Sequence, residues 1–164
     1  MKKLVWIAAL AALAGAPLSA DGHGTEGHGA DEHGRGNVQI ADIEMRFLYE
    51  RSGTLSDDIT AIKDFTAWNT LIGEGSAKEP ASDVLVAVRM TAFGEVHDER
   101  TLTIRAFDSD RNPLAERTIN GVGIKDSGYA HMLLEQSTCE GEIILEAAIG
   151  DQTMSEKIEL FCGE

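Results

Sequence analysis

The run "DVLVAVRMTAF", residues 83–93, decides the expected fold. Its β-branched, nearly continuous apolar side chains are typical of a central strand that is buried on both faces. The run "RTLTIRAF", residues 100–107, alternates apolar residues with Thr and Arg, as a half-buried strand does. Between them, "GEVHDER" at residues 94–100 has the polar composition of a turn, and we predict a hairpin turn there that contains His97.

Strand-like runs continue on both sides of this pair, separated by turn signals such as the tight "GDQ" at residues 150–152. The other predicted strands are 43–50, 114–119, 128–135, 142–149 and 153–161. Seven or eight short strands at this spacing predict an all-β fold, an antiparallel two-sheet sandwich that is immunoglobulin-like in the broad sense. For residues 56–72 we expect a strand or a loop rather than a helix capped by Ser56.

The methionines and histidines of these strands are predicted to be ordinary structural residues. The methionines occur one per predicted strand, which is typical of core fillers and does not favour a folded copper site. They are Met45, Met90, Met132 and Met154. His131 precedes Met132 on a strand, so only one of these two side chains is expected to face the core.

Residues 1–20 have the features of a secretory signal peptide. Two lysines are followed by an apolar run at 4–13, by the helix-breaking Pro17 and by small residues that favour cleavage after Ala20. The apolar run is too short to span a bilayer, which needs about 20 such residues. We therefore expect a periplasmic or secreted protein without a membrane span.

The charge of the chain is strongly negative. It carries 14 basic and 28 acidic residues, a formal net charge of −14 at pH 7. Such a charge repels nucleic acid and favours the attraction of cations. Nucleic-acid binding is therefore excluded as a function.

The chain has two cysteines, Cys139 and Cys162. In an oxidising compartment an even pair in a small exported domain is typical of one structural disulfide. The two residues lack the C-x-x-C spacing of a redox or metal-thiolate site. We expect a bridge that ties the C-terminal strand to its neighbour.

Residues 21–36 form a histidine-rich segment without a large apolar side chain, and we expect it to be disordered. Its first fifteen residues, "DGHGTEGHGADEHGR", divide into three units of five, so that His23, His28 and His33 recur at a fixed spacing. Flexible glycines let several imidazoles face one ion, and imidazole suits zinc, copper and nickel. The segment predicts the capture of a divalent metal ion by these three histidines. The alternative is a plain soluble spacer in front of the β-sandwich domain (37–164).

A further metal site follows if the signal peptide is cleaved after Ala20. The mature chain then begins with a free amine on Asp21, followed by Gly22 and His23. This resembles the amino-terminal copper- and nickel-binding motif, in which the amine, two amide nitrogens and the third-position imidazole surround one ion in a plane. The resemblance implies that these three residues bind Cu(II) or Ni(II), which prefer square-planar nitrogen ligands. Beyond copper, nickel or zinc no cofactor is expected, and none is required.

No catalytic residue is predicted. The patterns H-E-x-x-H and G-x-S-x-G do not occur in the sequence. "DSDRNP" (108–113) places Asp108, Asp110 and Asn112 at alternate positions, as the front of a calcium loop does. However, Pro113 stands where such loops have glycine, so we predict a turn and not a calcium site. The protein is not expected to be an enzyme.

The stretch "WNTLIGEGSAKEPAS" (68–82) resembles a W-N-x-x-I-G-E-G-x-A-x-x-P-x-S-like segment of exported bacterial β-sandwich proteins, which also have C-G-E near the C-terminus, as "FCGE" (161–164) has here. The resemblance implies the fold and the compartment but no activity. From the residues alone, Trp68 is interpreted as a core aromatic beneath a glycine-rich loop. The alternative is an exposed loop that docks a partner.

Two functions follow from the sequence. The first is an exported binding module, whose segment 21–36 captures Cu(II), Ni(II) or Zn(II) while the sandwich serves as carrier or docking body. The second is a structural or protein-interaction domain of the cell envelope. In that case the sandwich binds an unknown envelope protein through a sheet edge or the 73–82 loop, and the segment is only a spacer.

Overall fold

The structure is a computed structural model that describes residues 37–62, 65–69 and 76–163, without the side chains of 66–69 and 161–163. All of these residues belong to one unit, Glu32–Glu164. The predicted signal peptide (1–20) and the histidine-rich segment (21–36) lie outside the described residues.

The described part of the chain contains six strands. They are β1 (Gln39–Leu48), β2 (Thr66–Asn69), β3 (Asp83–Phe107), β4 (Pro113–Leu134), β5 (Gly141–Ile149) and β6 (Gln152–Gly163). One sheet joins them in the order β1-β3-β5-β6-β2, and β4 pairs with β3. All pairs are antiparallel except β2 with β6. The predicted all-β, largely antiparallel fold is confirmed for these residues, but the predicted seven or eight short strands are wrong, because β3 and β4 have 25 and 22 residues.

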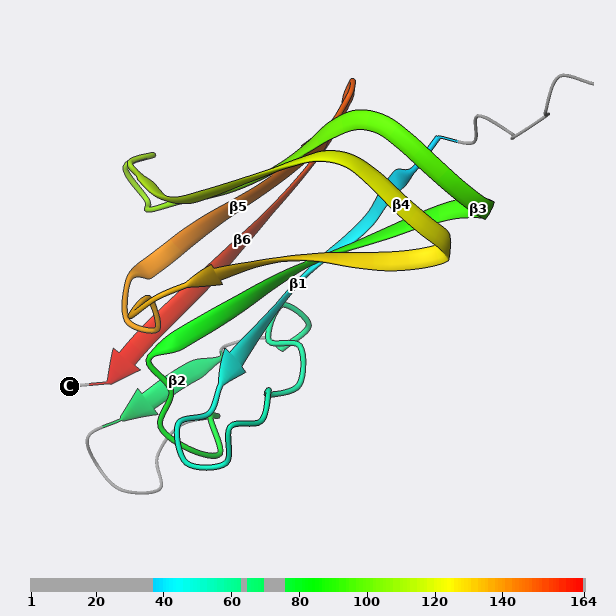
Figure 1. Cartoon of the computed structure of the whole chain (residues 1–164). Helices are drawn as coiled ribbons and strands as arrows, with labels where there is room; N and C mark the ends of the chain where they lie inside the picture. The colour runs from blue at the N-terminus through cyan, green and yellow to red at the C-terminus, as the bar shows by residue number, and fades with distance from the viewer. Residues whose placement is uncertain (1–36, 63–64, 70–75, 164) are drawn as a thin grey trace, which may run out of the picture. The chain divides into compact units, whose positions relative to one another are not determined.

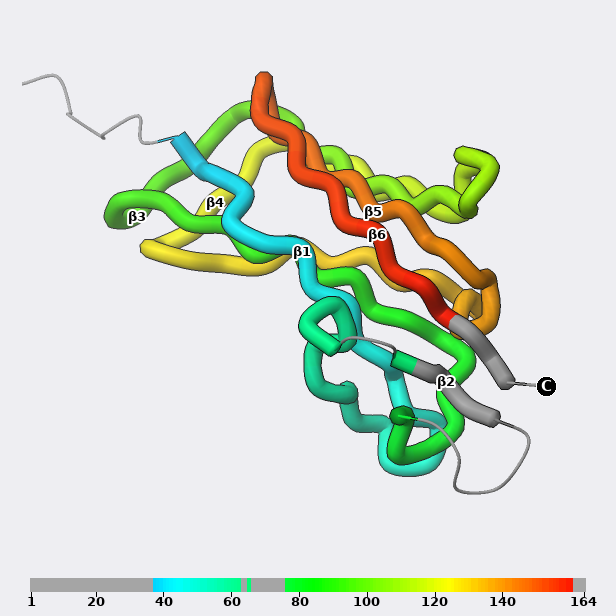
Figure 2. Tube along the Cα trace, turned by 180° about the vertical axis from the view of Figure 1, so that it is seen from behind, coloured from blue at the N-terminus to red at the C-terminus, as the bar shows by residue number. Residues whose placement is uncertain are grey.

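The hairpin of β3 and β4 organises the sheet. The two strands pair from Val84 with Leu134 to Phe107 with Pro113, and Figure 1 shows them bending together near the middle. The first half of β3 also pairs with β1, and the second half, from Leu102, pairs with β5. The sheet therefore curls, and β1 also packs against β5 and β6 (Figure 2).

The bend replaces the hairpin turn that the composition of residues 94–100 predicts. That prediction is wrong: His97 lies in β3 opposite Gly123, and the ladder continues through the region. Burial still alternates there, with Val96 and Asp98 buried and His97 exposed. Register shifts interrupt the ladder on both sides of this stretch, and such bulges bend and twist a strand. For the same reason the predicted strands 114–119 and 128–135 are parts of one strand, β4.

A single apolar core fills the inside of the curl. Every second residue is buried from Ile43 to Phe47 in β1 and from Leu145 to Ile149 in β5, as expected for strands with one face on a core. The largest fully buried side chains are Phe47, Ile43, Met45, Ile59, Met90, Leu102, Ile104, Leu134, Ile143, Leu145, Ile149 and Leu160. Met132 is buried while His131 is exposed, which confirms that only one of the two faces the core.

The connection from β1 to β2 is a loop, and its described residues contain no helix. Ser56 is buried, and its Oγ accepts a hydrogen bond of 2.9 Å from the Phe47 N–H. Phe65 packs edge-to-face on Phe47 with 5.2 Å between the ring centroids. The expectation of a strand or loop at 56–72 is confirmed for residues 56–62 and 65–69, whereas the side chain of Trp68 lies outside the described residues.

Candidate functional site

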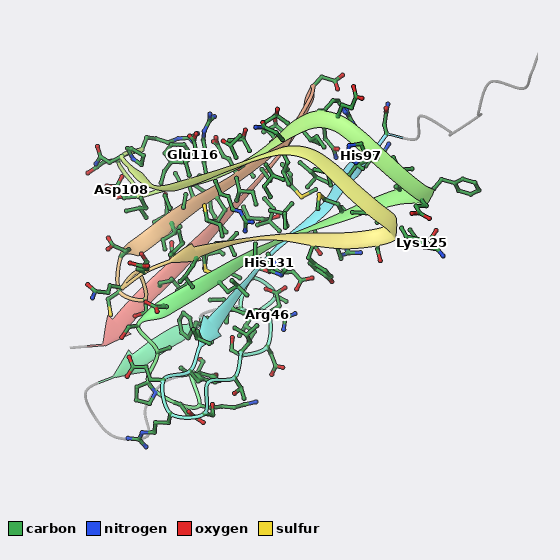
Figure 3. All side chains as sticks on the ribbon, in the orientation of Figure 1. Arg46, His97, Asp108, Glu116, Lys125 and His131 are labelled. Atoms are coloured by element: carbon green, nitrogen blue, oxygen red, sulfur yellow. The ribbon has the colours of Figure 1, made fainter. Side chains whose placement is uncertain are left out.

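The residues predicted to bind metal are Asp21, Gly22, His23, His28 and His33, and all of them lie outside the described residues. Within residues 37–62, 65–69 and 76–163, no three histidine, cysteine or acidic side chains come together as a metal site. The two histidines described are His97 and His131, which lie apart on the β3–β4 hairpin (Figure 3). Metal capture therefore stays a prediction from the sequence.

The described chain begins at a strong anchor on the bend of β3. The N–H of Val38 donates to Oδ2 of Asp98 at 2.9 Å, and the carbonyl of Val38 accepts from Nη2 of Arg100 at 2.8 Å. Two residues further along, the N–H of Ile40 donates to Oε1 of Gln152 at 2.9 Å, and the carbonyl of Ile40 accepts from Nε2 of Gln152 at 2.8 Å. Four hydrogen bonds from three side chains thus fix the point where the histidine-rich segment joins the domain.

The carboxylate of Asp98 is buried but fully satisfied. Its Oδ2 lies 2.6 Å from Nη2 of Arg100, and the residue is 7% exposed. The Arg100 side chain, with the backbone N–H groups of Arg100 and Val38, holds the pKa of Asp98 well below its usual range. A carboxylate that is paired in this way holds backbone in place and is poorly suited to acid–base chemistry.

The Asp108 turn carries no sign of a calcium site beyond its sequence. Oδ1 of Asp108 accepts from the N–H groups of Asp110 at 2.9 Å and Asn112 at 2.8 Å, and Oδ2 accepts from Nδ2 of Asn112 at 2.8 Å. These hydrogen bonds, chiefly those from Asn112, lower the pKa of Asp108. The carboxylate closes the turn between β3 and β4, so the prediction of a turn is confirmed.

The free edge of β4 is a candidate docking feature that the sequence analysis did not locate. Among the described strands, β4 pairs only with β3, so its other edge has no strand beside it. The last eight residues of β4, 127–134, read Ser-Gly-Tyr-Ala-His-Met-Leu-Leu and contain no Lys, Arg, Asp or Glu. We call residues 127–134 the uncharged edge.

Hydrogen bonds on the far side of the sheet fix which backbone groups of this edge point away from β3. The backbone of Met45 and Phe47 in β1 bonds to the loop at 56–59, away from β3. Backbone direction alternates along a strand, so Glu44 and Arg46 are the residues of β1 that bond to β3. Glu44 and Arg46 pair with residues of β3, so the residues that alternate with these partners in β3 bond to β4 instead. The same alternation along β4 leaves the N–H and C=O groups of every second residue of the uncharged edge pointing outward. These residues are Tyr129, His131 and Leu133.

The side chains of these three residues lie on the outer face of the sheet. Tyr129 is 51% exposed and Leu133 is 43% exposed. The Tyr129 ring stacks on His131 with 6.1 Å between centroids, and its hydroxyl lies 3.4 Å from Oε1 of Glu44. The uncharged edge therefore presents outward backbone groups beside an aromatic and an aliphatic side chain.

A cavity of about 210 Å³ lies between the two halves of β4. Its lining is mixed: Ile119 and Ile124 contribute apolar side chains, and Arg117, Tyr129 and His131 contribute polar ones. Nη1 of Arg117, in the first half of β4, donates a hydrogen bond to the backbone carbonyl of His131 in the second half. Arg117 therefore covers one of the outward carbonyls of the uncharged edge.

Comparisons with known proteins add little to this geometry. No family model matches the sequence, and no curated protein matches it. One similar solved structure is the β-glucuronidase of Parabacteroides merdae, crystallised with glycerol in its active site. It has a TM-score of 0.33 and 16% identity, over 48% of this chain and 11% of that chain. This likeness supports no conclusion about fold or activity. Among the described residues, no helix is long and apolar enough to cross a membrane.

Proposed function

We propose that this chain is an exported, non-enzymatic binding module, periplasmic or secreted. The histidine-rich segment 21–36 captures Cu(II), Ni(II) or Zn(II) through His23, His28 and His33, and the β domain serves as carrier and docking body. The observation that carries the proposal is the fixed five-residue spacing of the histidines among glycines and acids. The anchoring of Val38 and Ile40 supports it, because the segment is attached to a fixed point of the domain.

A titration of the exported protein with Cu(II) and Ni(II) tests this function, together with an intact mass that identifies the N-terminus. We expect a mature chain that starts at Asp21 and one square-planar site that is lost in His23→Ala. His97→Ala is a matched control, because this histidine lies in β3 outside the segment, and it should bind as the natural chain does. Weak binding that does not change in His23→Ala would contradict the amino-terminal motif.

The alternative is a protein-interaction domain for which segment 21–36 is only a spacer. The free, uncharged edge of β4 favours this function, since extended peptides add to such edges through main-chain hydrogen bonds. Deletion of residues 21–36 separates the two. Loss of the biological function after deletion supports metal capture, and its retention supports the interaction domain.

For the fold we propose the immunoglobulin-like sandwich in the broad sense. The two halves of the bent β3–β4 hairpin would supply strands to two facing layers. This is supported by the pairing of β1 with the first half of β3 and of β5 with the second half. The packing of β1 against β5 and β6 also supports it.

We also propose the disulfide between Cys139 and Cys162. Gly141 of β5 pairs with Leu160 of β6. Cys139 precedes this pair by two residues and Cys162 follows it by two, so both belong to the same end of the β5–β6 pair, which supports the bridge. No free cysteine is found in the described part of the chain. A mass lower by two hydrogens than that of the reduced protein is the expected result, and an unchanged mass on reduction would exclude the bridge.

A further inference from the structure

We propose that two copies of this chain pair through the uncharged edge, as antiparallel strands related by a two-fold axis at His131. The sheet would then continue from β4 of one copy into β4 of the other. The inference specifies the docking role proposed for the β domain, and it does not depend on metal capture.

The outward backbone groups fit such a pair. With the axis at His131, this residue faces His131 of the partner subunit, and Tyr129 faces Leu133 of the partner subunit. Each of the three outward residues donates one N–H and accepts on one C=O, as hydrogen-bonded pairs of an antiparallel ladder do. Three N–H groups from each copy give six hydrogen bonds across the axis, two of which form when Arg117 releases the His131 carbonyl in each copy.

The side chains on the outer face also match. Tyr129 and Leu133 are about half exposed in the single chain. In the pair, Tyr129 of each copy would lie beside Leu133 of the partner subunit. Aromatic and aliphatic side chains on directly opposite positions of neighbouring strands attract one another. The spacing of Tyr129 and Leu133 at equal distances from His131 makes this edge complementary to itself.

Local charge permits the approach although the whole chain is acidic. Asp42 and Glu44 of β1, on the outer face across β3 from the edge, are paired with arginine: Glu44 with Arg46 at 2.7 Å and Asp42 with Arg89 at 3.3 Å. The acids that adjoin the edge in the chain, Asp126 and Glu135, lie beyond its two ends. The remaining repulsion between two chains of formal charge −14 acts at longer range, where salt screens it beyond about 8 Å at physiological ionic strength. Added salt should therefore strengthen the pairing.

The first half of β4 cannot pair in this way. It exposes charged side chains, including Glu116, Lys125 and Asp126. Its backbone also has positive φ angles of +76° at Gly121 and +60° at Asp126, which turn it away from a regular extended strand. The pairing is thus confined to the uncharged edge.

Sedimentation equilibrium of the mature full chain in metal-free buffer tests the pairing over the micromolar range. We expect a monomer–dimer equilibrium that shifts toward dimer with salt. Leu133→Lys should raise the dimer dissociation constant by at least about tenfold, because each interface then contains two new like charges. Thr118→Lys is the matched control, since Thr118 is an exposed residue in the first half of the same strand, and it should not change the dissociation constant.

Hydrogen exchange at two protein concentrations supplies a second, independent measurement. The N–H groups of Tyr129, His131 and Leu133 should exchange more slowly at the higher concentration, and that of Thr118 should not. A monomer at all concentrations, or a dimer that Leu133→Lys leaves intact, would overturn the inference. If the chain stays monomeric but the histidine-rich segment still binds metal, this inference fails while the proposed function stands.

Discussion

The two halves of β4 differ although they share one partner strand. The first half, 113–126, begins with Pro113 and exposes Glu116, Arg117, Lys125 and Asp126 along its free edge. The second half, 127–134, has no charged residue. Natural sheets protect their edges with proline, inward or edge charges and bulges. The edge of β4 is therefore protected against pairing with another strand along its first half, and it lacks this protection along its second half.

The largest expected effect comes from breaking the bend that separates the two halves. Asp98→Ala leaves the guanidinium of Arg100 and the N–H of Val38 without their buried carboxylate. We expect the free energy of unfolding, measured with urea, to fall by about 3 kcal/mol, as for other broken buried ion pairs. Asp110→Ala in the exposed turn is the control, and it should change the same quantity by less than about 0.5 kcal/mol.

Acid should remove the same contribution in the natural chain. The hydrogen bonds from Arg100 lower the pKa of Asp98, so its carboxylate stabilises the fold fully above the pKa of an unfolded aspartate, about 3.9. This stabilisation is lost as the pH falls below that value toward the lower pKa of the folded state. The difference in unfolding free energy between the natural chain and Asp98→Asn should shrink over this range. A difference that stays constant down to the acid transition would contradict the assignment.

A smaller effect is expected at the junction of the two halves. A Cβ on Gly128 would lie 2.7 Å from Cγ2 of Ile124, whereas a Cβ on Gly123 would meet only Nδ1 of His97 at 3.6 Å. Gly128→Ala should therefore lower the free energy of unfolding by about 1–2 kcal/mol through overpacking. Gly123→Ala should leave it unchanged or raise it by up to about 0.5 kcal/mol, because alanine restricts the unfolded chain. Equal thermal midpoints for the two variants would show that the junction is not tightly packed.

The smallest effect on stability, and the one that sharpens the comparison most, is expected for Arg117→Ala. Arg117 is exposed and no ion pair joins it to a described residue, so the free energy of unfolding should change by less than about 0.5 kcal/mol. Removal of its guanidinium frees the His131 carbonyl, and the dimer dissociation constant should fall by about threefold. Arg105→Ala removes an arginine that pairs with Glu116 instead, and it should leave dimerisation unchanged. A weaker dimer in Arg117→Ala would show that Arg117 supports the edge and does not cover it.

The strand content was predictable from local pattern. The apolar runs at 83–93 and 100–107, the turn at 150–152 and the burial of Met132 beside an exposed His131 all follow from two-residue periodicity and turn chemistry. These features depend on residues that are close together in the chain.

The bend was not predictable, because its stability comes from distant residues. Gly94, Glu95 and Asp98 give residues 94–100 the composition of a turn. The carboxylate of Asp98 is acceptable inside a strand only because Val38, 60 residues away, and Arg100 satisfy it. Likewise, the lack of charge at 127–134 is visible in the sequence, but only the pairing shows that this segment is an edge.

The long β3–β4 hairpin also sets an order of folding. Its turn at 108–112 closes a short loop, so the pairing of Phe107 with Pro113 costs little chain entropy and can extend pair by pair toward Leu134. β1 must instead find partners about 45 residues further along, such as Val88 for Ile43. A chain synthesised from its N-terminus therefore holds β1 unpaired until β3 has appeared. Such non-local pairing slows folding, so the attachment of β1 to β3, like that of β2 to β6 across a still longer separation, is expected to follow the formation of the hairpin.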